Sequence, residues 1–157
     1  ALTHAHSRSQ MACAMYVQMA IHLLQGASPR MAYEAMKQEI LTYYGSEPYL
    51  RELPHFSAIL QNNIAEYQEA EIQSSGYVVH TLEASLWCLL NHTSYTETVL
   101  AAVNLGEDTD TTGAVAGGLA GIYYGTDQIP EVWLNCLARK HDIIELAHRL
   151  YARCYET

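Results

Sequence analysis

The chain has 157 residues, of which 50% are apolar; this length and composition favour one globular domain with a hydrophobic core and exclude a disordered polypeptide. Its 17 acidic and 8 basic side chains give a formal net charge of −9, which argues against general binding to nucleic acid or to an anionic membrane surface. A small anionic ligand would need a local positive group or a metal ion.

Apolar side chains recur at helical spacing along most of the chain, and no alternating strand pattern is sustained. A first helix is predicted to end before Gly26, and its apolar stripe is formed by Met11, Met15, Met19 and Leu23. Ser28 and Pro29 suit the N-cap and first turn of a second helix. We expect this second helix to end at Gly45, because glycine readily adopts the left-handed conformation that closes helices.

A loop bracketed by Pro48 and Pro54 is predicted to follow, and after it a third helix, which is indicated by Ile59, Leu60, Ile64 and Tyr67. Another predicted helix begins after Gly76 and carries Leu82, Leu86, Leu89 and Leu90. Ser94 and Glu97 have the spacing of a capping box, which opens the next helix.

Two more helices are expected near the C-terminal end. The first is short and has Pro130 in its first turn, and the second has apolar positions at Ile143, Leu146, Ala147 and Leu150. The pattern therefore predicts an all-α fold of about eight helices, with no internal repeat and no low-complexity linker.

The cysteines are widely spaced and include no Cys-x-x-Cys pair: Cys13, Cys88, Cys136 and Cys154. Each lies in an apolar helical context, which is typical of a buried free thiol. No stretch approaches the roughly 20 consecutive apolar residues of a membrane span, and the first residues do not resemble a signal peptide. We therefore expect a reducing cytoplasmic location, no structural zinc and no membrane partner.

The segment 104–113 holds three carboxylates and three threonine hydroxyls. Two carboxylates two positions apart, such as Asp108 and Asp110, project to the same side of an extended backbone. Like charges roughly 4 Å apart repel by about 1 kcal/mol in water, and by more in a drier site. This crowding of Asp108 and Asp110 with Glu107 therefore indicates a bound cation or a helix cap.

A helix of small residues is predicted to follow the acidic segment, from about Ala114 to Tyr124, with Gly113, Gly117 and Gly121 at four-residue spacing. Each glycine inside a helix costs about 1 kcal/mol relative to alanine. We expect close approach of neighbouring helices to offset this cost, which would put the helix at the centre of a bundle.

Helix capping by Asp108 or Asp110 would stabilise the helix by about 1 kcal/mol, but it explains only one of the three acids. An EF-hand is excluded because position twelve of the loop is Leu119, where a bidentate glutamate is required. A phosphate-binding loop is excluded because there is no lysine and no preceding strand. Two interpretations remain: simple capping, and a hard-cation site with oxygen ligands that suits magnesium or manganese.

Three segments resemble the ADP-ribosylglycohydrolase family. Gly-Glu-Asp-Thr-Asp-Thr-Thr-Gly at 106–113, followed by Ala-Val-Ala-Gly-Gly-Leu-Ala-Gly-Ile-Tyr-Tyr-Gly, is similar to the C-terminal signature of that family. Ser-Gly-Tyr-Val-Val-His-Thr-Leu-Glu-Ala at 75–84 resembles its substrate-loop segment, and Ala-Leu-Thr-His at 1–4 resembles its Thr-His segment before a long helix. In this order the three segments cover nearly the whole chain.

The resemblance implies an orthogonal, all-helical bundle with a pair of magnesium or manganese ions at the bottom of a cleft. It also implies hydrolysis at an N-glycosyl or O-glycosyl bond that releases ADP-ribose from a modified protein side chain. Asp108, Asp110 and Thr111 fall on the positions that ligate metal in the family. Glu107 stands where many members have a second glycine.

The resemblance further implies an ADP-ribose cleft lined by His4 and Tyr77, with Gly76 and Val78 beside Tyr77 as backbone contributors. An aromatic face at Tyr77 suits stacking with adenine. No role is assigned to the remaining histidines, which have the positions of surface residues: His6, His22, His55, His80, His92, His141 and His148.

The other motifs of the family lie before the Thr-His segment: an opening helix with Gly-Asp-Ala-Leu-Gly-like residues, a Thr-Asp-Asp metal triplet and the acidic residue that guides catalysis. We therefore expect residues 1–157 to form the C-terminal half of a single domain, to lack the catalytic residue and to be inactive alone. The expected ligand is ADP-ribose or an ADP-ribosylated protein. We also expect the chain to associate with the N-terminal half or with a second copy of itself, because either would cover apolar surface that is otherwise exposed.

Two alternatives remain open. The protein could be a non-catalytic member of the same family that binds ADP-ribose or serves structurally, as crystallin-like relatives do. It could also be a helical assembly module whose acidic turn merely caps a helix.

Overall fold

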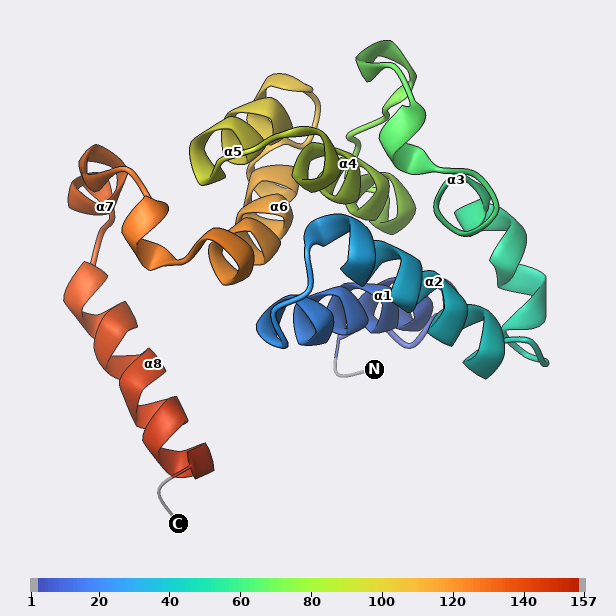
Figure 1. Cartoon of the computed structure of the whole chain (residues 1–157), viewed down its shortest axis with the longest axis horizontal. Helices are drawn as coiled ribbons and strands as arrows, with labels where there is room; N and C mark the ends of the chain where they lie inside the picture. The colour runs from blue at the N-terminus through green and yellow to red at the C-terminus, as the bar shows by residue number, and fades with distance from the viewer. Residues whose placement is uncertain (1–2, 156–157) are drawn as a thin grey trace.

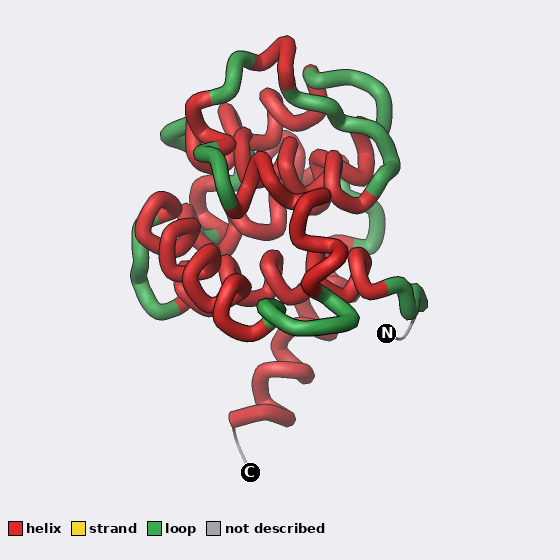
Figure 2. Tube along the Cα trace, turned by 90° about the vertical axis from the view of Figure 1, so that its right-hand side faces the viewer, coloured by secondary structure: helices red, strands yellow, loops and turns green. Residues whose placement is uncertain are grey.

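The computed structural model describes residues 3–155, which contain eight α-helices, four short 3₁₀ helices and no strand (Figure 2). The prediction of an all-α fold is confirmed. Ala1 and Leu2, which belong to the predicted Thr-His segment, lie outside the described residues.

The core lies where α1 (Ser7–Leu24) and α2 (Pro29–Tyr43) pack against α4 (Val78–Asn91) (Figure 1). On α1 the predicted apolar stripe is fully buried or nearly so, and it consists of Met11, Met15, Met19 and Leu23. Helix α4 is buried along most of its length from Val79 to Leu90, as expected for an element surrounded by others. It contacts α5 (Tyr95–Asn104) and α6 (Thr109–Tyr124) as well as α1.

The glycines of α6 allow the close helix packing that the sequence predicts. A Cβ atom on Gly113 would lie 2.9 Å from Val103 Cγ1 of α5, and one on Gly117 would lie 3.5 Å from Val99 Cγ2. On another side of α6, a Cβ on Gly118 would collide with the hydroxyl of Tyr16 in α1. Helix α6 therefore packs directly against α1, α4 and α5. The expectation that it is the central helix is wrong, because only four of its residues are buried, whereas α4 is buried along most of its length.

The predicted third helix is wrong. Residues 50–66 form a 3₁₀ helix, η1 (Leu50–Phe56), a single α-turn, α3 (Ser57–Leu60), and a second 3₁₀ turn, η2 (Ile64–Glu66). Pro54 lies inside η1, so the prediction of a loop between the two prolines is also wrong. A further turn, η3 (Glu69–Glu71), precedes α4.

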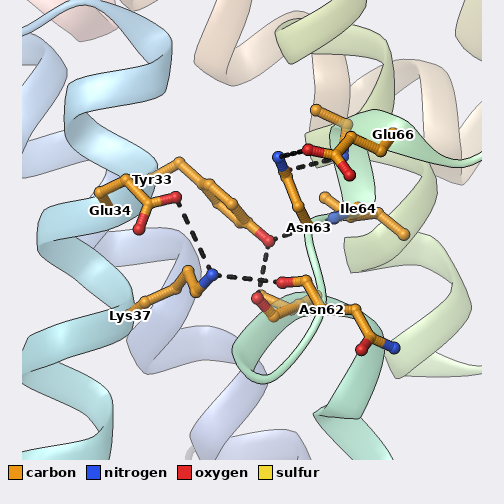
Figure 3. A network of polar contacts seen from close by, with 9 residues as sticks. Tyr33, Glu34, Lys37, Asn62, Asn63, Ile64 and Glu66 are labelled. Atoms are coloured by element: carbon orange, nitrogen blue, oxygen red, sulfur yellow. Dashed lines mark hydrogen bonds and ion pairs between the residues drawn. The ribbon is translucent and has the colours of Figure 1, made fainter.

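Tyr33 of α2 accounts for the break in this segment (Figure 3). Its hydroxyl donates to the Ile59 carbonyl at 2.6 Å and accepts from the Ile64 N–H at 3.4 Å. A continuous α-helix would have paired both backbone groups within itself. Burial raises the pKa of Tyr33 to about 12, so the hydroxyl keeps its proton and remains a donor.

Lys37 adds a second tie between α2 and the same segment (Figure 3). Its ammonium donates to the Asn62 carbonyl at 3.2 Å and lies 5.1 Å from the centre of the Tyr33 ring. Asn63 then caps η2, because its side chain accepts from the Ala65 N–H. The irregular segment is thus held in place by α2.

The helix boundaries follow the predicted caps in part. Ser28 accepts from the Met31 N–H and Ser94 accepts from the Glu97 N–H, as expected. Glu97 completes no capping box, since its carboxylate accepts from the N–H and hydroxyl of Thr93. The expected left-handed cap at Gly45 is wrong: α2 ends at Tyr43, and the positive-φ glycines described are Gly26, Gly106 and Gly125.

Only one of the four cysteines is buried. Cys88 lies in the core on α4, where burial raises the pKa of its thiol to about 12, whereas Cys13, Cys136 and Cys154 are exposed. The expectation of four buried thiols is therefore wrong, because the helices that carry the other three present them to solvent.

The C-terminal elements extend away from the other helices (Figure 1). After η4 (Thr126–Gln128), Pro130 immediately precedes α7 (Glu131–Cys136), and α8 (Lys140–Tyr155) follows. No residue of α8 is buried, and four of its exposed apolar side chains are Ile143, Ile144, Leu146 and Leu150. Within residues 3–155, no helix is long and apolar enough to cross a membrane.

The glycine packing predicts a position-specific effect on stability. We expect Gly113→Val to lower the free energy of unfolding by about 1–3 kcal/mol, because the new side chain overlaps Val103 of α5. Ala114→Val is the matched control, since Ala114 is exposed on the same turn of α6. Urea denaturation measures both, and equal effects at the two positions would contradict the proposed close approach.

Glu83 of α4 predicts a dependence on pH. Burial raises its pKa from 4.5 to about 7, so between these values the folded state holds a proton that the unfolded state has released. Stability therefore falls as pH rises through this window. We expect Glu83→Gln to remove this loss, on the order of 1 kcal/mol after allowance for solvent screening of a partly buried group. Urea denaturation at several pH values between 4.5 and 7 measures the free energy of unfolding of wild type, of Glu83→Gln and of the exposed control Glu66→Gln. A loss that persists in Glu83→Gln would contradict the assignment.

Candidate functional site

The segment before α4 is joined to the acidic turn before α6 by two hydrogen bonds. The Asp108 N–H donates to the Ser74 carbonyl at 3.1 Å, and the Ser74 hydroxyl donates to the Gly106 carbonyl at 2.9 Å. Ser74 is buried, so these bonds are protected from water. Two segments about thirty residues apart in sequence are thereby fixed side by side.

The carboxylate of Asp108 lies directly against Gly76. A Cβ atom on Gly76 would be 2.8 Å from Asp108 Oδ2, closer than a real side chain tolerates. Glycine at this position therefore makes room for the carboxylate. Gly76 and Asp108 are therefore in contact. The sequence assigns them to different parts of the site: Gly76 to the substrate loop and Asp108 to the metal ligands.

The acidic turn itself depends on two consecutive left-handed residues. Gly106 has φ +86° and Glu107 has φ +53°. The left-handed conformation costs a non-glycine residue about 1 kcal/mol or more. Glu107 thus adopts a backbone conformation that suits glycine, the residue found at this position in many members of the family that the chain resembles. The turn forms even though this chain has glutamate there.

The Asp108 carboxylate is stabilised in its charged form. Interaction with the Thr111 side chain, and then with Asp110, lowers the pKa of Asp108 below its usual range. Asp110 Oδ1 accepts from the Thr111 N–H at 2.9 Å. Asp108 occupies the N-cap position of α6, yet its side chain makes no capping hydrogen bond to the helix.

The donor set of the turn has the chemistry of a hard-cation site, but it is incomplete. Carboxylate and hydroxyl oxygens of Asp108, Asp110 and Thr111 suit magnesium or manganese. Nearby, the Thr112 hydroxyl is buried and has no hydrogen-bond partner among the described residues. No group of three or more His, Cys, Asp or Glu side chains within residues 3–155 could hold a metal ion. The acidic turn therefore does not form a complete metal site within these residues.

Tyr77, beside Gly76, is held by an arginine and a histidine. Arg8 Nη1 donates to the Tyr77 hydroxyl at 2.7 Å, and the guanidinium carbon lies 5.7 Å from the ring centre. The His80 ring contacts Tyr77 edge-on, with ring centres 4.9 Å apart. His80 Nδ1 is also within 2.8 Å of the Ser75 hydroxyl. The exposed phenol of Tyr77 is therefore restrained at its hydroxyl and at its ring.

The structure brings together some of the predicted site residues and not others. Gly76, Tyr77 and Asp108 form one cluster, and Asp110 and Thr111 lie exposed in the first turn of α6. Val78 is the first residue of α4, and its side chain packs partly buried against the core. His4 is exposed, and its hydrogen bond is to its neighbour Thr3, so no described contact joins it to this cluster.

Sequence reasoning missed three residues that hold the Tyr77 side chain in place, directly or through another residue: Arg8, Glu52 and His80. His80 follows Tyr77 by one helical turn, a spacing that could have indicated it. Arg8 and Glu52 could not have been paired from the sequence, because they lie 44 positions apart and Glu52 is on the unpredicted helix η1.

Comparisons with known proteins point to one family. The sequence profile of the ADP-ribosylglycohydrolases matches residues 1–157. A curated ADP-ribosylarginine hydrolase of Serratia proteamaculans is 34% identical over 152 residues, which are 95% of this chain and 37% of the relative. The ADP-ribosyl dinitrogen reductase glycohydrolase of Rhodospirillum rubrum is 32% identical over 139 residues, or 88% of this chain and 41% of the relative.

A solved structure shares the fold. This ADP-ribosylglycohydrolase-related protein complex aligns with a TM-score of 0.77 and 30% sequence identity, over 95% of this chain and 48% of the other. The all-helical arrangement is therefore that of the family. The chain spans about two fifths of the length of the two curated relatives and about half of the solved one.

The contact between Gly76 and Asp108 predicts energetic coupling. We expect Gly76→Ala to lower the melting temperature, because its methyl group displaces the Asp108 carboxylate, and Asp108→Ala to relieve that clash. In a double-mutant cycle the two substitutions should couple by about 0.5–3 kcal/mol. Strictly additive effects on the free energy of unfolding would contradict the contact.

Proposed function

The chain belongs to the ADP-ribosylglycohydrolase family, and on that basis we propose that the protein is a divalent-metal-dependent hydrolase that releases ADP-ribose from modified protein side chains or related substrates. The observation that carries the proposal is the contact of Asp108 with Gly76. This contact joins the acidic turn to residues 72–77, the loop before α4, which is called the Tyr77 loop below. Ligands for a cation and an aromatic surface for a nucleotide thereby lie within one cluster.

Asp108, Asp110 and Thr111 are the residues that would hold magnesium or manganese. A carboxylate ligates metal in its charged form, and interaction with Thr111 lowers the pKa of Asp108, which favours that form. Such ions supply Lewis-acid stabilisation of charge and orient the ribose hydroxyls and a water. In this proposal the turn provides part of a two-metal site, and further protein groups complete it.

The Tyr77 loop is the nucleotide side of the proposed site. Arg8 and His80 restrain the Tyr77 side chain, which reduces the entropy lost when a ligand binds to it. Because Gly76 has no side chain, the Asp108 carboxylate lies directly against the Tyr77 loop, so a cation held by Asp108 would be beside a nucleotide bound there. His4 is proposed to line the same cleft in the presence of ligand.

Substrate and assembly follow from the relatives by analogy. Their names specify ADP-ribosylarginine and ADP-ribosylated dinitrogen reductase, and the linkage cleaved here is proposed to be an N-glycosyl or O-glycosyl bond of that type. We expect residues 1–157 to be inactive alone, because their acidic turn offers too few ligands for tight metal binding. The N-terminal half or a second copy of the chain would complete the site.

The same shortage of ligands favours one alternative: a non-catalytic member that binds ADP-ribose or acts structurally, like the crystallin-like proteins of this family. This alternative keeps the Tyr77 loop as a binding surface and assigns no chemistry to the acidic turn. Binding without hydrolysis is the result that distinguishes it.

The metal assignment predicts the behaviour of the acidic turn in the full-length protein. We expect Asp108→Asn and Asp110→Asn each to lower the manganese-dependent release of ADP-ribose from an ADP-ribosylated arginine peptide by about 10- to 100-fold or more, because each removes a metal ligand. Asp127→Asn, which changes an exposed acid on η4, should leave the rate unchanged.

Two results would count against the hydrolase. Unchanged rates in both variants would reject the metal assignment, and binding of ADP-ribose by the wild type without any release from the peptide would favour the non-catalytic alternative. Chelation of divalent ions should abolish the wild-type rate, and added manganese should restore it.

A further inference from the structure

We infer that Arg8 is a ligand-binding residue, whose guanidinium recognises the anionic diphosphate of the ADP-ribosyl ligand at the Tyr77 loop. This inference rests on the proposed function, since it takes the ligand class from there. It adds a residue of α1 to a site that the sequence places in the Tyr77 loop and the acidic turn.

Arg8 is held at the site from two directions. Its Nε–H donates to Glu52 Oε2 at 2.8 Å, and its Nη1 group donates to the Tyr77 hydroxyl at 2.7 Å. Glu52 belongs to η1 and Tyr77 to the loop before α4, so three segments of the chain converge on one guanidinium. An arginine fixed in this way has already lost much of the side-chain freedom that ligand binding would otherwise cost.

Glu52 acts as the positioning residue for Arg8. Its side chain is only 12% exposed, and its other close basic neighbour, the His55 ring, is 4.0 Å away. A buried carboxylate requires a close cation, so Glu52 keeps Arg8 in one orientation. The ion pair is therefore more restrictive than an exposed one, such as that between Arg51 and Glu47.

The guanidinium retains donors for a ligand. Arginine has five N–H donors in a planar array, and the described contacts of Arg8 use one at Nε and one at Nη1. The remaining N–H groups on Nη1 and Nη2 have no partner among residues 3–155. Such a planar array matches the oxygen geometry of phosphate.

The charge of the chain makes Arg8 the suitable group for this role. With a net charge of −9, the chain repels anions, so an anionic ligand needs a local cation. Within the described part of the chain, Arg8 is the basic side chain whose hydrogen bonds reach a predicted site residue, Tyr77. The nearby acids of the turn carry the opposite charge and, in the proposed function, face the metal ions.

The test measures the affinity of the full-length protein for ADP-ribose, by calorimetry in the presence of manganese, with inorganic diphosphate as competitor. We expect Arg8→Gln to weaken ADP-ribose binding by about 10- to 100-fold, the effect of losing hydrogen bonds from a charged donor. Inorganic diphosphate should compete with ADP-ribose in the wild type and not in the variant. Arg51→Gln, which breaks an exposed arginine–glutamate pair, is the matched control and should behave as wild type.

The outcomes separate this inference from the proposed function. Wild-type protein that does not bind ADP-ribose would reject the proposed function, whereas equal ADP-ribose affinities in wild type and Arg8→Gln would overturn only the role of Arg8. Weakened ADP-ribose binding with diphosphate competition intact would mean that Arg8 acts only by holding Tyr77, and would also overturn the inference.

A folding defect in Arg8→Gln would not leave the inference untested. The double variant with Glu52→Gln removes the buried charge that the lost arginine leaves behind, so it should melt close to wild type. It should still lose diphosphate competition completely, whereas Glu52→Gln alone, which keeps the guanidinium but removes its positioning partner, should weaken that competition without abolishing it. Competition that survives in the folded double variant would contradict a contact between Arg8 and the diphosphate.

Discussion

The close approach of α6 to its neighbours is the constraint on which the rest of the structure depends. Side chains at Gly113 and Gly118 would overlap Val103 of α5 and the Tyr16 hydroxyl of α1, so α6 lies close to both helices. Each of these glycines weakens the isolated helix by about 1 kcal/mol, and packing must offset that cost. Fixing α6 also fixes the acidic turn, because the turn is the N-terminal end of this helix.

The position of the turn is then set by its contacts with the segment before α4. Buried Ser74 bonds to the backbone on both sides of Glu107, and Gly76 makes room for the Asp108 carboxylate. The carboxylates of the turn are close together and repel one another unless neighbouring groups stabilise their charge. Here the described neighbours of the carboxylates include a bare glycine, Gly76, beside Asp108, and the Thr111 N–H, which donates to Asp110.

The irregular part of the chain also contributes to the site. Tyr33 and Lys37 of α2 hold the segment that follows η1 (Figure 3). Glu52 of η1 accepts a hydrogen bond from Arg8. Arg8 in turn restrains Tyr77. Packing on α2 is thus linked, through an ion pair and a hydrogen bond, to the loop proposed to bind the nucleotide. Helix α8, by contrast, has no buried residue and takes no part in this linkage.

Local features of this protein were determined by its sequence. Apolar spacing located most of the helices, Ser28 and Ser94 marked two of their starts, and the row of small residues indicated that α6 would be closely packed. These predictions succeed because helix spacing and capping involve residues within four positions of one another. The same local reasoning failed where a distant group intervened: the Tyr33 hydroxyl satisfies the backbone of residues 59 and 64, and the expected third helix does not form.

Only the tertiary structure decided which segments meet. The resemblance of three segments to one family placed Gly76, Tyr77 and Asp108 in a common site, but it could not say that Gly76 touches Asp108. Nor could it reveal that Arg8 joins Glu52 to Tyr77 across 44 and 69 positions. Such contacts depend on how whole helices pack against one another. The packing is set by the combined burial of many side chains, and the spacing of residues within one segment does not encode that combined burial.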